Sequence, residues 1–172
     1  MTKKNIIIYA TVDWHAKKVA EFCKKNFKKN FEIFFVDDFL WDLENYEKIL
    51  IISSIRYGKF HKNIRNFIKE NYKILNNKKS WFISINLVAR KAEKNTVETN
   101  IYTKKFFKKN PFKPKKIWVF GWVLDYSKYW FFDRIMIKFI MKLTKWPTST
   151  KEAIDYTNWE KLKIFCEDFD KI

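Results

Sequence analysis

Short apolar runs of strand length alternate along this chain with segments in which apolar residues recur at helical spacing. The first apolar run covers residues 5–10, and it is followed by Ala16, Val19, Ala20, Cys23 and Phe27, three or four positions apart. The same patterns predict four further strands of the sheet at 31–36, 49–53, 81–85 and 117–120, and further helices at 64–72, 97–108 and 157–169. Residues 153–156 can form an additional short strand after the insertion. The last helix is expected to begin at Thr157, which stands three residues before Glu160 as in a capping box.

Strands that are apolar throughout and alternate with helices are typical of a parallel sheet with helices on both faces. The sequence therefore predicts an α/β, doubly wound, five-stranded parallel sheet in a single domain spanning residues 1–172. Ligands of such sheets bind beyond the carboxyl ends of the strands. We accordingly expect the functional loops at 11–16, 54–59 and 86–91 and in the segment after Gly121.

An insertion at about 122–150 carries the most distinctive pattern. An aromatic stretch that includes Tyr129 and Trp130 leads into a segment with one basic side and one apolar side at helical spacing. The basic side consists of Arg134, Lys138, Lys142 and Lys145, and the apolar side of Phe132, Ile135, Met136, Phe139, Ile140 and Leu143. Such a helix suits an anionic membrane surface or a flat, apolar, acidic ligand. An ordinary surface helix with a solvated basic side has the same pattern.

Composition adds a large positive charge, since 36 basic and 19 acidic residues give a formal net charge of +17. Such a charge indicates an anionic partner, namely nucleic acid, acidic lipid or an anionic substrate. Heavy use of Lys, Asn, Ile and Phe weakens this inference, because biased codon usage produces the same enrichment. No apolar run approaches the roughly 18 residues of a spanning helix, so any membrane contact is expected to be peripheral.

Candidate chemistry is sparse. Two glycines in the whole chain exclude the glycine-rich nucleotide motifs. The start of a helix after a strand can still bind phosphate, and here the loop offers the Thr11 hydroxyl, the His15 ring and backbone N–H groups. His15 can equally be a helix-start residue without a ligand. Cys23 and Cys166 fit neither a disulfide framework nor a zinc spacing, so we expect reduced core thiols and no metal site.

Four blocks of the chain resemble one enzyme family. They are the S-I-R-Y-G block at 54–58, the S-I-N-L-V-A-R-K block at 84–91, the aromatic and basic block at 129–142, and the Y-T-N-W-E block at 156–160. In this order they resemble the flavodoxin-like, quinone-dependent protoporphyrinogen IX dehydrogenases of bacterial haem synthesis. The resemblance runs nearly end to end and implies a flavodoxin-like fold with the insertion near the last strand.

The resemblance implies FMN as cofactor. FMN would contact the phosphate loop and the two loops that flank its ring: Thr11, Val12, Asp13, Trp14, His15, Ser54, Ile55, Arg56, Tyr57, Gly58, Ser84, Asn86, Leu87, Val88 and Ala89. Residues expected to meet substrate or membrane are Arg90, Tyr129, Trp130, Arg134, Lys138 and Lys142. The phosphate loop departs from the family, because Ala10, Trp14 and Ala16 stand where relatives carry Ser, Gly and Thr. No residue is identified as a catalytic acid or base.

The implied partners are protoporphyrinogen IX, menaquinone or ubiquinone, and an anionic membrane surface, at the cytoplasmic face of the bacterial inner membrane. An alternative function is that of a flavodoxin-type electron carrier, although such carriers are typically acidic around the flavin. A nucleic-acid-binding module is a third hypothesis. It leaves the apolar side of the 132–143 segment without a purpose, so no nucleic-acid partner is expected.

Overall fold

The computed structural model describes residues 4–11, 13–39, 42–124 and 153–171. In chain order, the elements are β1 (Lys4–Ala10), α1 (His15–Asn26), β2 (Glu32–Phe35), β3 (Tyr46–Arg56), β4 (Lys59–Phe60), α2 (Lys62–Asn77), β5 (Lys79–Ile85), the short 3-10 helices η1 (Leu87–Arg90) and η2 (Ala92–Lys94), α3 (Ile101–Lys109), β6 (Lys116–Phe120), β7 (Val123–Leu124), β8 (Ile154–Asp155) and α5 (Trp159–Asp170).

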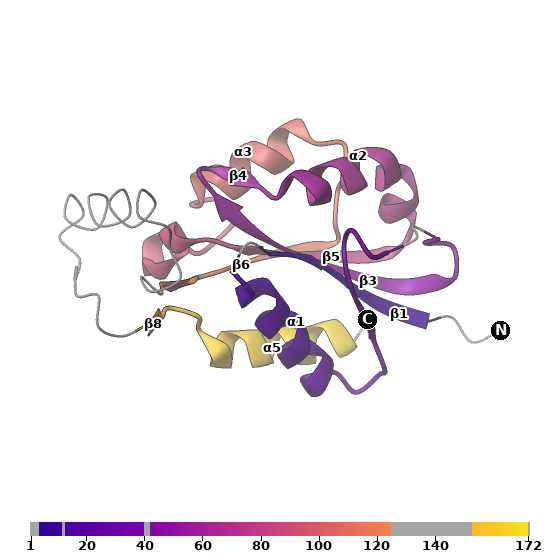
Figure 1. Cartoon of the computed structure of the whole chain (residues 1–172), viewed down its shortest axis with the longest axis horizontal. Helices are drawn as coiled ribbons and strands as arrows, with labels where there is room; N and C mark the ends of the chain where they lie inside the picture. Colours follow the sequence, from indigo (N-terminus) through magenta and orange to yellow (C-terminus); the bar gives the residue numbers. More distant parts are fainter. Residues whose placement is uncertain (1–3, 12, 40–41, 125–152, 172) are drawn as a thin grey trace.

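Five parallel strands form the centre of the fold in the order β2-β1-β3-β5-β6. The short β4 adds an antiparallel partner to β3, and β7 and β8 form a separate antiparallel pair. Helices α1 and α5 lie on one side of the sheet and α2 and α3 on the other (Figure 1). The predicted doubly wound parallel sheet is therefore confirmed.

Each face of the sheet has its own apolar core, because alternate side chains of the central strands point to opposite sides. Ile7 and Ile52 pack with α1 and α5, whereas Ile8 and Ile51 pack with α2 and α3. Both cysteines lie in the first core, free and buried as predicted. Burial and a hydrogen bond to the Cys166 thiol raise the pKa of Cys23 well above its ordinary value.

One lysine is fully buried beside the end of α5. The Lys48 ammonium donates to the carbonyl oxygens of Phe169 at 3.0 Å and Asp170 at 3.5 Å. Carbonyls in the last turn of a helix carry a partial negative charge, which a cation there stabilises. Burial still lowers the pKa of Lys48. This contact fixes the carboxyl end of α5 against β3.

Several predicted boundaries were wrong. Helix α2 runs five residues past its predicted end at 72, to Asn77. Residues 54–56 were expected in a loop, but they continue β3, because Tyr57 (φ 50°) and Gly58 (φ 73°) are both left-handed and form a two-residue hairpin turn into β4. The helix predicted at 97–108 begins only at Ile101, because Asn100 caps it by accepting from the Thr103 N–H. The last helix is capped by Asn158, not by Thr157, whose hydroxyl is used elsewhere.

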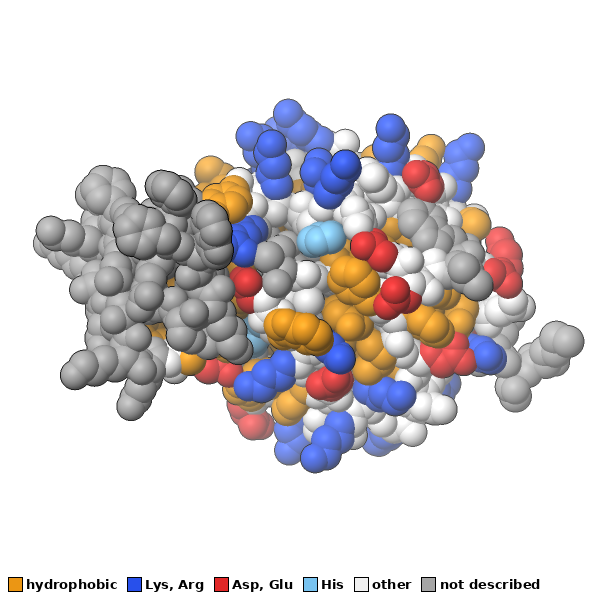
Figure 2. Space-filling view, in the orientation of Figure 1, with side chains coloured by type: hydrophobic (Ala, Val, Ile, Leu, Met, Phe, Trp, Pro, Cys, Tyr) orange, Lys and Arg blue, Asp and Glu red, His pale blue; other side chains and the backbone are white. Residues whose placement is uncertain are grey.

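The predicted insertion falls almost wholly outside the described residues, and so do Val12, Tyr129, Trp130, Arg134, Lys138 and Lys142. Within the described part of the chain, no helix is long and apolar enough to cross a membrane. Lys and Arg side chains gather over α2 and α3 (Figure 2). Four of them are the exposed lysines of α3, namely Lys104, Lys105, Lys108 and Lys109.

Candidate functional site

The start of α1 lies at the carboxyl end of β1, and its capping residue makes no side-chain hydrogen bond to the helix. Trp14 occupies the capping position in a left-handed conformation (φ 62°), with 68% of its surface exposed. Helices α2, α3 and α5 are each capped by a side chain, from His61, Asn100 and Asn158. In α1, the Thr11 hydroxyl accepts from the Ala16 N–H at 3.4 Å. The amino end of α1 thus keeps N–H donors and a positive dipole for an anion.

An ion pair joins this loop to the end of β3. The Arg56 guanidinium lies 3.5 Å from the Asp13 carboxylate, and both side chains are mostly buried. The pair offsets the negative charge that Asp13 would otherwise bring to an anion site at the start of α1. It also connects two of the predicted cofactor loops, 43 positions apart in sequence.

The turn after β3 presents an exposed aromatic ring. Tyr57 is 62% exposed, and the Arg56 guanidinium lies 5.5 Å from its ring centroid. Trp14 and Tyr57 are the two non-glycine residues with positive φ in the described part of the chain. Strained backbone of this kind often occurs at ligand sites. Beneath the turn, the Ser54 hydroxyl is buried and has no hydrogen-bond partner among the described residues, whereas Ile55 packs in the core.

The third predicted loop, at 86–91, is held by a buried polar network. Asn86 Oδ1 accepts from the Ala89 N–H at 3.0 Å and from Asn100 Nδ2 at 2.9 Å. The Ser84 hydroxyl lies 2.8 Å from that of Thr103, which itself donates to Asn100 Oδ1 at 3.0 Å. Ser84 and Asn86 were predicted to contact the cofactor. That contact stays a prediction, while both side chains take part in the network that shapes the loop.

His15 has a protein partner. Its Nε2 lies 2.8 Å from the Thr157 hydroxyl, which is also 3.3 Å from the Gly121 carbonyl. The hydroxyl has one proton and donates it to the carbonyl, so it accepts from His15 Nε2–H. Burial lowers the pKa of His15 to about 4, with a smaller opposing effect from Asp155. The ring is therefore neutral at pH 7 and anchors α1 to the 156–158 segment.

The structure brings the described candidates together at one rim of the sheet. The carboxyl ends of β1, β3 and β5 carry Thr11 and Asp13, Ser54 and Arg56, and Asn86, respectively, and neighbouring parallel strands place these ends side by side. A cavity of about 400 Å³ adjoins the first loop and is lined by Tyr9, Thr11, Trp14, Lys17, Phe35 and Asp38. Contact of each candidate with a cofactor stays a prediction.

Sequence reasoning missed three residues that hold the elements at this rim, Asn100, Thr103 and Thr157, and also Lys161 near the end of β6. Asn100 contacts Asn86 and Thr103 contacts Ser84 because α3 packs against β5, which the sequence pattern does not indicate. Thr157 lies in the block at 156–160 that carries the family resemblance, and Lys161 follows it directly. Their position in or beside this block is the feature of the sequence that could have identified both residues.

Comparison with known proteins identifies the family. Residues 6–151 match the family described as a flavodoxin domain. The chain is 36% identical to the protoporphyrinogen IX dehydrogenase [quinone] of Leishmania major over 96% of this chain and 74% of that protein. It is 34% identical to the protein of the same name from Escherichia coli (strain K12), over 96% and 93%. The chain belongs to the family of protoporphyrinogen IX dehydrogenases [quinone].

The fold agrees with that assignment. Oxidised flavodoxin 1 from Bacillus cereus superposes with a TM-score of 0.53 over 98% of this chain and 97% of that one, at 14% sequence identity. At that identity the likeness concerns the fold alone. The flavodoxin-like architecture is thus shown by two independent comparisons, whereas the specific enzyme family is shown by the sequence relatives.

Proposed function

We propose that the protein is an FMN-dependent oxidoreductase that converts protoporphyrinogen IX to protoporphyrin IX in haem biosynthesis and passes the electrons to a quinone. One observation carries this proposal: relatives named protoporphyrinogen IX dehydrogenase [quinone] match 96% of the chain at 34–36% identity. A flavodoxin-like fold by itself hosts many functions. The relatives' names do not favour the electron-carrier alternative.

The described residues fit FMN. Its phosphate would bind the uncapped amino end of α1, where N–H donors and the helix dipole favour an anion. The Ser54 hydroxyl, buried without a partner among the described residues, would gain one from the ring system. Trp14 and Tyr57 would offer aromatic surface beside it. When bound, FMN supplies the capacity to accept hydrogen from the porphyrinogen and to pass electrons on singly or in pairs.

Each loop has a distinct task in this proposal. Arg56 holds the Asp13 carboxylate, so the phosphate meets a neutral pair instead of a bare negative charge. The network around Asn100 fixes the 86–91 backbone, so that loop needs no ordering when a ligand arrives.

The loop lacks hydroxyl donors at Ala10 and Ala16, each worth about 0.5–1.5 kcal/mol. Lys17, whose ammonium lies 5.3 Å from the Trp14 ring centroid, supplies a nearby cation that offsets part of this loss.

The quinone partner, menaquinone or ubiquinone, is lipid-soluble, so the proposal includes peripheral contact with the cytoplasmic face of the inner membrane. The support is the sequence pattern of the 132–145 segment, in which four cations stand opposite six apolar side chains. Near an anionic membrane each cation contributes about 1 kcal/mol.

The direct test is anaerobic mixing of the FMN-loaded protein with protoporphyrinogen IX. The flavin absorbance should bleach, and a quinone added afterwards should restore it. Bleaching that requires a reductase protein and never follows the porphyrinogen would favour the electron carrier. No flavin binding at all would overturn both functions.

The membrane contact has a separate test, by co-sedimentation with anionic liposomes. Changing Arg134, Lys138 and Lys142 to Glu should release the protein, with a loss of more than about a hundredfold in partitioning. A control with the same charge change, Lys104, Lys105 and Lys108 to Glu on α3, should retain most of the binding. Equal release of the two variants would refute a specific role for the 132–145 segment.

A further inference from the structure

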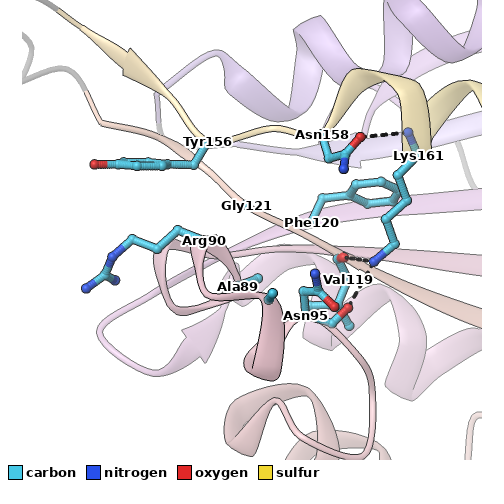
Figure 3. A pocket seen from close by; sticks show the side chains of 10 residues that line it. Ala89, Arg90, Asn95, Val119, Phe120, Gly121, Tyr156, Asn158 and Lys161 are labelled. Atoms are coloured by element: carbon cyan, nitrogen blue, oxygen red, sulfur yellow. Dashed lines mark hydrogen bonds between the residues drawn. The ribbon is translucent and has the colours of Figure 1, made fainter.

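A second pocket lies between the 86–91 loop, the end of β6 and the start of α5. It has a volume of about 220 Å³ and is lined by Ala89, Arg90, Ala92, Asn95, Val119, Phe120, Gly121, Tyr156, Asn158 and Lys161. Val119, Phe120 and Gly121 lie at or just after the end of β6. Because β5 lies between β3 and β6 in the sheet, this pocket is separated from the end of β3 by β5. Figure 3 shows Tyr156 and Arg90 extending in the same direction, with Lys161 reaching in from α5 on the other side.

Lys161 brings a half-buried positive charge to this pocket. Its ammonium donates to the carbonyl oxygens of Asn95 at 3.1 Å and Val119 at 3.3 Å, which are both neutral. Burial lowers the pKa of Lys161. Of the described residues that line the pocket, none is acidic, and Arg90 adds a second cation. A cation removed from water and lacking a counter-charge favours an anionic ligand.

Neighbouring groups fit the same kind of ligand. Asn158 Oδ1 caps α5 by accepting from the Lys161 N–H at 2.8 Å, and its amide nitrogen, which has no hydrogen bond within the described part of the chain, lies toward the pocket (Figure 3). The pocket also lies at the positive end of the α5 dipole. A side chain at Gly121 would overlap the Tyr156 carbonyl, so glycine keeps the two segments in contact there.

The volume limits what can enter. A cavity of about 220 Å³ lies below the roughly 300–1,000 Å³ of sites that enclose a whole small molecule, so it admits an acidic arm and not a macrocycle. Protoporphyrinogen IX carries two propionate arms. We infer that this pocket binds one propionate carboxylate of the tetrapyrrole, with Lys161 as its charged partner and Asn158 as a second donor. The inference rests on the proposed function and assigns a specificity role to Lys161.

The test compares protoporphyrin IX with its dimethyl ester, which lacks both carboxylates, in titrations of the FMN-loaded protein followed by porphyrin absorbance. The measured quantity is the ratio of the two dissociation constants, because a loss of folded protein affects both ligands equally. Lys161→Met should lower the preference for the free acid by about tenfold or more, the value of one charge-assisted contact. Lys163→Met, an equal charge change at an exposed position on α5, should alter it by less than about twofold. Lys161→Arg, which keeps the positive charge, should retain most of the wild-type preference for the free acid.

Equal effects of Lys161→Met and Lys163→Met would overturn the inference, because general attraction to a basic protein would then explain the preference. So would a wild-type protein that binds acid and ester equally. In either case, porphyrinogen-dependent bleaching of the flavin would show that the proposed function holds although the pocket assignment is wrong. If the wild type neither bleaches nor binds protoporphyrin IX, both the function and the pocket assignment fail.

Discussion

The loops that follow β1 and β5 use their hydrogen bonds in opposite ways. The loop after β5 is closed on itself, since Asn86 and Asn100 satisfy one another and the neighbouring backbone. The loop after β1 leads into a helix whose capping residue, Trp14, offers no side-chain acceptor and holds a left-handed backbone. One loop is shaped by internal contacts before any ligand arrives, whereas the other retains donors that a ligand can use. The loop after β5 therefore provides a preformed surface, and the loop after β1 provides an anion site.

The largest expected effect comes from breaking the closed loop. Asn100→Ala removes both donors to Asn86 and Lys94 and the acceptor of the Thr103 N–H and hydroxyl, all in a buried site. We expect a loss of about 4 kcal/mol in the free energy of unfolding, measured by urea denaturation. Asn77→Ala, at the exposed end of α2, should cost less than about 0.5 kcal/mol. Similar losses for the two variants would show that the network does not stabilise the fold.

Acid should weaken the anchor of the open loop. The pKa of His15 is about 4 in the folded protein, against 6.5 ordinarily. Its contribution to stability is therefore full above pH 6.5 and is lost as pH falls from 6.5 to about 4, because the unfolded chain binds the proton first. The loss should total about 3 kcal/mol. In His15→Gln this part of the pH dependence should disappear from denaturation curves, and an unchanged slope would contradict the buried His15–Thr157 contact.

The smallest expected effect comes from relaxing the open loop. Trp14→Gly removes the left-handed strain of a non-glycine residue and should raise the free energy of unfolding by about 1 kcal/mol. Lys24→Gly, at an exposed position inside α1, should lower it by about the same amount. If both variants lose stability, then the conformation of Trp14 is not a strained one.

Much of the fold could be predicted, because it depends on local pattern. The apolar runs at 5–10 and 49–53 could form buried strands only in a sheet covered on both faces. The first run lies in β1 and the second in β3. The capping of α5 could not be predicted in the same way. Thr157 and Asn158 are both good capping residues. The contact of Thr157 with His15, 142 positions away, decides between them.

The site was predictable as a set of loops but not as a set of contacts. Parallel topology alone indicates that residues 11–16, 54–58 and 86–91 meet at one rim. It does not indicate that Arg56 pairs with Asp13 or that α3 supplies the partners of Asn86. The assignment of Ser84 and Asn86 as cofactor contacts overlooked this second role, since both types of contact need a polar residue at a strand end.

The central claim is that the uncapped start of α1 holds the phosphate of FMN. It is tested most directly by titrating the protein with FMN and with riboflavin, which lacks the phosphate, at about 0.5 M salt to screen the long-range attraction of a basic protein. FMN should bind at least about tenfold more tightly, because the phosphate gains charge-assisted hydrogen bonds at the helix start. Equal affinities, or no binding of either flavin, would contradict the account.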